Sequence, residues 1–106
     1  MSTAKSDTMD MMKANACEAE AVLKQLANSK RLLILCSLLS GEKCVGDLAN
    51  MVDLSQSALS QHLAKMRDAG LVSCEKRGQM VFYSISSMEA QALLSTLYLI
   101  YCNKKV

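Results

Sequence analysis

Proline and tryptophan are absent from this chain of 106 residues, and glycine occurs only four times. Proline inside a helix removes a backbone hydrogen bond and clashes with the preceding turn, and glycine costs helix stability through its backbone entropy. Their scarcity therefore favours helices over most of the length. With 51% hydrophobic and 21% charged residues, the chain is too apolar for a disordered segment, and its length suits a single domain over residues 1–106.

A large charge imbalance is also lacking, because 12 lysines and arginines face 10 aspartates and glutamates, for a net charge of +2. This balance alone does not indicate a nucleic-acid binder, so the distribution of the basic residues has to decide. The N-terminal stretch holds no secretory hydrophobic run and no membrane span, since Lys13 interrupts its apolar residues. We therefore expect a cytoplasmic protein without a membrane partner.

Closely spaced cysteines are missing too. The five cysteines are Cys17, Cys36, Cys44, Cys74 and Cys102, and no two of them lie closer than eight positions. Zinc sites need three or four ligands, usually at short spacings, and the single histidine, His62, adds little to such a set. We expect no metal and no cofactor, and we interpret Cys17, Cys44 and Cys74 as small core or capping residues. The chain also lacks a glycine-rich loop and a histidine beside a nucleophile, so we expect no enzyme.

Hydrophobic periodicity and capping residues predict five helices and one hairpin. The helices are expected at residues 8–26, 30–39, 45–51, 56–69 and 87–102. Alternation between residues 71 and 85 predicts the hairpin, with its turn at Arg77-Gly78. Two helices joined by Asp53-Leu54-Ser55 suggest a helix-turn-helix. The expected fold is mainly α (α+β), a winged helix-turn-helix with five helices and a two-stranded β-wing.

The helix at residues 56–69 carries the first functional signal. Leu59, Leu63 and Met66 form its inward stripe, whereas most of its outward residues are small, polar and uncharged. Hydroxyls and carboxamides suit base edges in the major groove, and nearby cations suit phosphates. The predicted DNA-binding residues are Ser55, Gln56, Ser57, Ser60, Gln61, His62, Lys65 and Arg67, with Lys76 and Arg77 at the tip of the hairpin.

The last helix is apolar on almost every side, with Leu93, Leu94 and the run from Leu97 to Tyr101. A chain this small cannot easily cover such a helix by itself. We therefore expect a homodimer in which the terminal helices pack against each other, together with the first helix. A twofold dimer also places two recognition helices about one DNA turn apart, as a palindromic operator requires.

The stretch from Leu54 to Val72, LSQSALSQHLAKMRDAGLV, resembles the recognition helix and wing entry of the winged-helix ArsR family of bacterial regulators. The stretch from Leu26 to Leu32 is similar to the opening of that family's second helix, and the resemblance covers nearly the whole chain. It implies a dimeric repressor that binds operator DNA and releases it on sensing a signal. A familiar thiolate site of the family, Cys-Val-Cys-Asp-Leu, is here Cys44-Val45-Gly46-Asp47-Leu48, so one thiolate is missing.

Two remaining cysteines, Cys36 and Cys102, stand in contexts that resemble the BigR, SqrR and HlyU-like branch of the family. That resemblance implies that reactive sulfur species or oxidants link the two thiols and weaken DNA binding. We expect Cys102, near the chain end, to be attacked first and Cys36 to resolve the product. Two alternatives stay open: an As(III)-responsive repressor that uses Cys102 and Cys17 across the dimer, and a DNA-binding anti-silencer that senses nothing.

Overall fold

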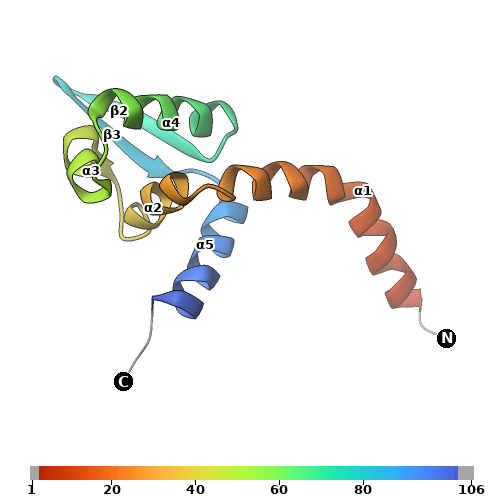
Figure 1. Ribbon diagram of the computed structural model, residues 1–106. Coiled ribbons are helices and arrows are strands. Elements are labelled where there is room, and N and C mark those ends of the chain that lie inside the picture. The colour runs from red at the N-terminus through yellow and green to blue at the C-terminus, as the bar shows by residue number, and fades with distance from the viewer. Residues whose placement is uncertain (1–2, 103–106) are drawn as a thin grey trace.

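The computed structural model describes residues 3–102, which form five helices and a three-stranded antiparallel sheet (Figure 1). In chain order the elements are α1 (Thr3–Leu26), α2 (Ser29–Ser37), β1 (Lys43–Cys44), α3 (Val45–Val52), α4 (Gln56–Asp68), β2 (Val72–Arg77), β3 (Met80–Ile85) and α5 (Met88–Tyr101). The expected winged helix-turn-helix, mainly helical with a β-wing, is confirmed.

Three helices begin where a side-chain oxygen can accept a free backbone N–H of the first turn. Asn28 accepts from the N–H of Arg31 at 3.0 Å before α2. Ser55 does the same before α4, and Ser87 before α5. The sequence predicted these helix starts to within one residue, because capping depends on adjacent residues. The end of α2 was predicted too late, since the helix stops at Ser37 and the chain turns through the following residues.

The core lies between α2, α3, α4, the start of α5 and the base of the hairpin. Ile34 and Leu35 of α2 are fully buried in it. Leu59, Leu63 and Met66 of α4 are equally buried, which confirms the predicted inward stripe. Burying each such side chain contributes about 1.5–3 kcal/mol. This packing fixes α4 by one face and leaves its other face to the solvent.

The sheet has the order β1-β3-β2, so the wing contains a third strand that the sequence analysis missed. β1 is only two residues long and pairs through Lys43 with Tyr83 of β3, too short for an alternating pattern to show. The hairpin turn also differs from the expectation. Arg77 pairs with Met80 as the last residue of β2, so the turn consists of Gly78 and Gln79. Gly78 has a φ of +63°, which glycine adopts without strain.

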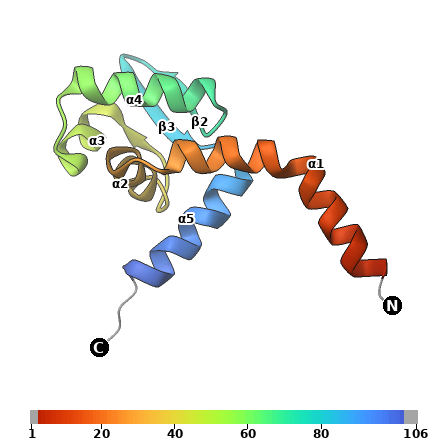
Figure 2. The ribbon, with the colours of Figure 1, turned by 45° about the vertical axis from the view of Figure 1, so that its right-hand side comes forward.

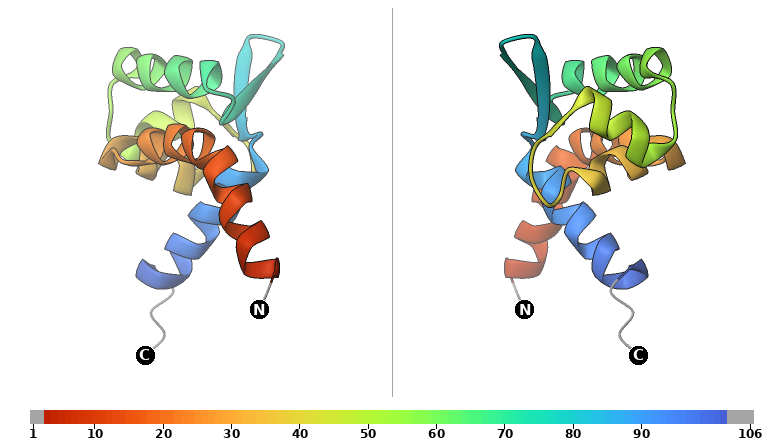
Figure 3. Two further views of the ribbon diagram at one scale, coloured as in Figure 1. Left: turned by 90° about the vertical axis from the view of Figure 1, so that its right-hand side faces the viewer. Right: turned by 90° about the vertical axis from the view of Figure 1, so that its left-hand side faces the viewer.

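α1 and α5 project away from the body of the molecule, and α1 bends part-way along its length (Figure 2). α4 and the hairpin lie at the opposite end from the tip of α5 (Figure 3). Among the helices within residues 3–102, none is long and apolar enough to cross a membrane. The fold thus separates a polar end with α4 and the wing from an end with two projecting helices.

Candidate nucleic-acid interface

The outer face of α4 carries exposed, uncharged side chains, most of which are polar. The exposed residues on this face are Gln56, Ser57, Ser60, Gln61 and Ala64. Ser57, Gln61 and Ala64 lie opposite the buried stripe while Gln56 and Ser60 flank it, so the core fixes the direction in which the hydroxyls and carboxamides point. None of them is charged, and side chains of this kind donate to and accept from base edges in a major groove.

Ser55 is the N-cap of α4. Its hydroxyl oxygen accepts the N–H of Ala58 at 3.2 Å and lies 3.3 Å from the hydroxyl of Ser57. The preceding turn contains Asp53 in a left-handed conformation, with a φ of 58°. Aspartate tolerates this conformation better than most side chains, so the sharp turn between α3 and α4 is locally encoded.

A basic cluster flanks the outer face of α4. Burial lowers the pKa of His62, and the charges of Arg31, Lys65 and Lys30 lower it further. Lys30 and Arg31 begin α2, so the fold brings a second helix start to the side of α4. These two residues were not predicted as part of the site, although two consecutive cations in the first turn after the Asn28 cap were a visible signal.

The last turn of α4 is joined to β2 through sulfur. Nη1 of Arg67 donates to Sγ of Cys74 at 3.4 Å, and this hydrogen bond is the main cause that raises the pKa of Arg67. Cys74 faces Tyr83 across the hairpin, and burial together with Cys74 raises the pKa of that tyrosine. Cys74 is exposed, so its interpretation as a core residue was wrong.

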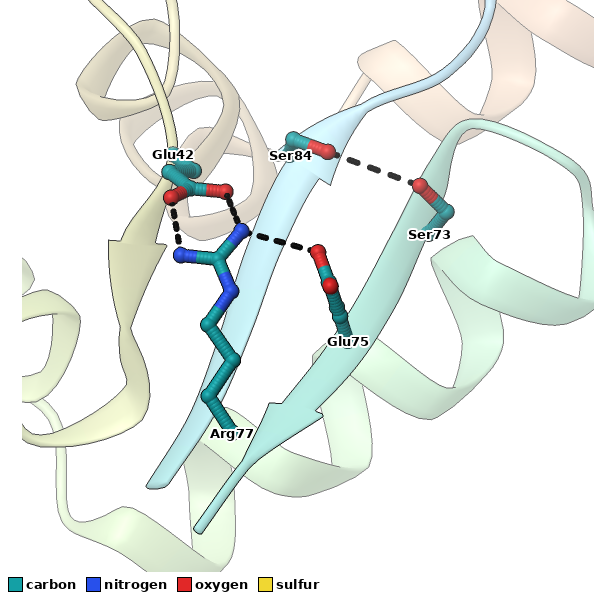
Figure 4. Close-up of polar contacts among 5 residues, drawn as sticks. All are labelled: Glu42, Ser73, Glu75, Arg77 and Ser84. Carbon is teal, nitrogen blue, oxygen red and sulfur yellow. Dashed lines mark hydrogen bonds and ion pairs between the residues drawn. The ribbon is translucent and has the colours of Figure 1, made fainter.

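The two basic residues expected at the tip of the hairpin have different surroundings. Lys76 is exposed on β2 and points into solvent. Arg77 instead lies between the carboxylates of Glu42 and Glu75 (Figure 4). Together they raise the pKa of Arg77 above its ordinary value. Arg77 therefore belongs to an ion-pair network at the end of β2 and not to the turn.

The thiols of Cys36 and Cys102 interact although 66 positions separate them in the sequence. Cys36 lies on α2, and its pKa is raised first by burial and then by the charge of Cys102. Cys102 is exposed and directly follows α5, which packs against α2. The fold thus brings the two predicted sensing residues within electrostatic range.

The other cysteines divide between core and surface. Cys44 is buried and precedes α3 without a side-chain capping bond, so its predicted place in the core is confirmed. Cys17 is exposed on α1, which corrects the expectation of a core residue. Within residues 3–102 no three metal-binding side chains come together as a possible ion site.

An apolar surface marks the opposite end of the molecule. A groove of about 1060 Å³ runs between the second half of α1 and the start of α5, with Leu23 and Leu93 in its lining. Further along α5, Leu99, Ile100 and Tyr101 are more than half exposed. A contiguous apolar surface of this kind is typical of a protein interface.

Comparison with known proteins gives consistent matches. Residues 28–73 match the family described as bacterial regulatory protein, arsR family. The transcriptional activator HlyU of Vibrio cholerae is 50% identical over 91 residues, which cover 86% of this chain and 84% of HlyU. The structure of its reduced form has a TM-score of 0.83 at 49% identity and covers 87% of this chain and 97% of that chain.

Two further structures extend the match. The transcriptional repressor BigR from Xylella fastidiosa has a TM-score of 0.84 at 32% identity, covering 91% of this chain and 98% of that chain. A homodimeric winged helix-turn-helix DNA-binding domain from Mycobacterium bovis has a TM-score of 0.73 at 28% identity, covering 84% and 83%. The chain therefore belongs to the ArsR family of bacterial regulatory proteins and is a DNA-binding transcriptional regulator.

Proposed function

We propose that the chain is a homodimeric repressor that binds operator DNA when reduced and releases it when sulfur atoms link Cys36 to Cys102. The observation that carries this proposal is the packing of α5, which Cys102 directly follows, against α2, which holds Cys36, and the raised pKa of Cys36, caused first by burial and then by Cys102, agrees with it. Charges interact over a limited distance in water, so the effect requires that the two thiols lie near each other. One thiol belongs to a core helix and the other directly follows a projecting helix, which is the arrangement that a covalent switch needs.

The surroundings of the two thiols support an order of attack. Cys102 is exposed at the end of α5 and is open to a dissolved donor. Cys36 is half-buried, and its raised pKa lowers its thiolate fraction near neutral pH. Because the thiolate is the nucleophile, Cys102 reacts first and Cys36 resolves the product.

An organic tetrasulfide, RS–S–S–SR, provides a balanced reaction for this switch. The Cys102 thiolate attacks the sulfur next to one RS group and displaces it as a thiolate. The Cys36 thiolate then attacks the sulfur next to the remaining RS group and displaces that as well. The product is a tetrasulfide bridge, the two cysteine protons end on two RSH molecules, and the donor is the oxidant. A longer bridge tolerates a wider separation of the two α-carbons than a plain disulfide does.

The homodimer in this proposal is supported by the exposed apolar residues of α1 and α5 and by the homodimeric relative from Mycobacterium bovis. In such a dimer α5 lies at the subunit interface, while α2 lies in the core beneath α4. A bridge between α2 and Cys102 changes the separation and the tilt of the two α4 helices in the dimer. Both α4 helices can bind one duplex only within a narrow range of separations. A change therefore weakens several phosphate and base contacts together.

Fluorescence anisotropy with an operator duplex tests the proposal. The reduced protein is expected to bind with nanomolar affinity and with strong salt dependence. Treatment with glutathione tetrasulfide is expected to weaken binding in the wild type and in Cys17→Ser, the matched control. Cys36→Ser and Cys102→Ser should keep their affinity after treatment, and mass spectrometry should find the bridge only when both thiols are present.

Equal affinities of the treated and reduced wild type would overturn the sulfur switch and leave a DNA-binding regulator that does not respond to this donor. A parallel titration with arsenite separates the metalloid alternative. Release by arsenite that depends on Cys17 would favour that alternative, because Cys17 takes no part in the proposed bridge.

A further inference from the structure

One arginine joins the end of β2 to the loop that precedes β1 (Figure 4). Nη1 of Arg77 donates to Oε2 of Glu42 at 2.5 Å, and Nη2 donates to Oε1 of the same carboxylate at 2.8 Å. Nη2 also donates to Oε1 of Glu75 at 2.8 Å. The guanidinium carbon lies 4.7 Å from the centroid of the Phe82 ring. We call these four residues, Glu42, Glu75, Arg77 and Phe82, the Arg77 clasp.

The clasp uses the groups with which Arg77 would hold a DNA phosphate. Two parallel N–H bonds to one carboxylate occupy the same planar fork that binds a phosphate. Two carboxylates around one guanidinium also leave the clasp with a net negative charge, which repels the DNA backbone. Direct contact with DNA would therefore require Arg77 to leave partners that hold it on two sides.

The two faces of β2 point to different neighbours. Side chains alternate along a strand, so Cys74 and Lys76 share one face while Glu75 and Arg77 share the other. Cys74 accepts its hydrogen bond from Arg67 of α4, so the first face is the one turned toward α4. Lys76 thus lies on the α4 side of the hairpin, and the clasp lies on the opposite side.

The outer part of β2 packs little against the core. Val72 is the only residue of β2 that is buried in the core, and the rest of the strand is exposed. Near its base, the hydroxyls of Ser73 and Ser84 lie 3.5 Å apart across the two strands. Besides the pairing of β1 with β3 and the hydrogen bond from Arg67 to Cys74, the clasp ties the end of β2 to the body of the protein. It reaches Glu42, which follows α2 through a turn closed by the Gly41 N–H and the Leu38 carbonyl at 3.1 Å.

We propose that Arg77 is a positioning residue that sets the angle of the wing through Glu42, so that Lys76 on the other face reaches a phosphate. Arg77 acts on DNA affinity through the wing and does not touch the duplex. This inference rests on the proposed function, in that α4 and the wing face the operator.

If the clasp sets the angle of the wing, Glu42→Ala should weaken DNA binding although it removes a negative charge. Removing a negative charge near DNA would strengthen binding by electrostatics alone, whereas loss of the clasp weakens it. We expect Glu42→Ala and Arg77→Gln to weaken binding by similar factors and to lower the slope of log K against log salt to the same extent, because each displaces Lys76 from its phosphate. The exchange of charges in Glu42→Arg with Arg77→Glu should restore affinity, because it rebuilds an ion pair of the same net charge. Glu20→Ala on α1 is the matched control for removing an exposed carboxylate, and its affinity should not change.

Anisotropy of the reduced protein at several salt concentrations measures these effects, and thermal unfolding of each variant verifies that it folds. Lys76→Gln should lower the slope of log K against log salt by about 0.9, the value for one phosphate contact. If instead Arg77→Gln lowers the slope while Glu42→Ala leaves it unchanged, and the charge exchange fails to restore affinity, Arg77 contacts phosphate and the inference is overturned. If neither the Lys76 nor the Arg77 variants alter binding, the wing does not meet DNA, and the proposed placement of the operator fails as well.

Discussion

Nη1 of Arg67 and Sγ of Cys74 lie 3.4 Å apart, and this hydrogen bond ties the last turn of α4 to the first half of β2. The recognition helix and the wing are therefore coupled by side chains as well as by the short connection at Gly70. Arg67 is exposed and has donors beyond the one that Cys74 accepts, so it can hold the wing and meet a phosphate together.

Arg67→Gln and Cys74→Ala separate these two roles. Arg67→Gln removes a cation from the interface, so the slope of log K against log salt should fall by about 0.9. Cys74→Ala removes only the acceptor and should leave the slope as it is. Operator binding by fluorescence anisotropy across a salt series measures both variants. An unchanged slope for Arg67→Gln would exclude it as a phosphate contact.

The capping serines Ser55 and Ser87 provide a matched pair, because each hydroxyl accepts a backbone N–H three residues later. Replacing either with alanine should lower the free energy of unfolding by about 1 kcal/mol, measured by urea denaturation. Only Ser55→Ala should also weaken operator binding, since Ser55 begins α4 and Ser87 begins α5. Equal loss of DNA affinity in both variants would indicate a general effect of stability.

Local patterns predicted the parts of the fold that depend on neighbouring residues. The stripe of Leu59, Leu63 and Met66 repeats at three- and four-residue steps, so it showed which face of α4 is buried and which is exposed. The turn Asp53-Leu54-Ser55 marked the start of the same helix, in which Ser55 is the N-cap. The direction of the α4 side chains, and with it most of the candidate interface, followed from the sequence.

Contacts between distant positions could not be predicted in this way. Glu42 and Arg77 are 35 positions apart, and no local pattern indicates that the loop before β1 reaches the end of the hairpin. Lys30 and Arg31 approach His62 only because α2 packs beneath α4. The proximity of Cys36 and Cys102 was expected from the resemblance to a family, since no periodicity relates the two residues.

The pKa of Cys36 provides a test that is independent of DNA. Burial raises it first and the charge of Cys102 raises it further, so Cys102→Ser removes the second cause. The thiolate fraction of Cys36 at mildly alkaline pH should then increase, and iodoacetamide should alkylate Cys36 faster than in the wild type. Peptide mass spectrometry measures this rate, with Cys17→Ser as the control. A rate equal to that of the wild type would show that the two thiols do not interact.

The lowered pKa of His62 leads us to expect opposite effects of pH on the stability of the protein and on its DNA binding. Its pKa lies below the ordinary value of 6.5 in the folded protein, so the unfolded chain takes up the proton more readily. Stability should therefore fall as the pH drops through about 6.5 and stop falling below the folded pKa. DNA phosphates favour the protonated imidazole, so operator affinity should rise over the same range.

His62→Gln should flatten both pH profiles in this range. Urea denaturation and anisotropy at matched pH values measure them. Profiles that run parallel in the wild type and the variant would remove His62 from the interface and assign the pH dependence to other groups.

The dimer proposal is tested by a charge on the exposed end of α5. Leu99 is 61% exposed and Met51 on α3 is 55% exposed, so glutamate at either position should leave the folded subunit intact. In a twofold dimer Leu99→Glu buries two like charges at the interface, which is strongly unfavourable, while Met51→Glu adds charge outside it. Sedimentation should find monomers only for Leu99→Glu, with operator affinity reduced because one recognition helix binds alone. If both variants sediment as the wild type does, the apolar end of α5 is not the dimer interface, and the bridge between Cys36 and Cys102 would need another route to the DNA.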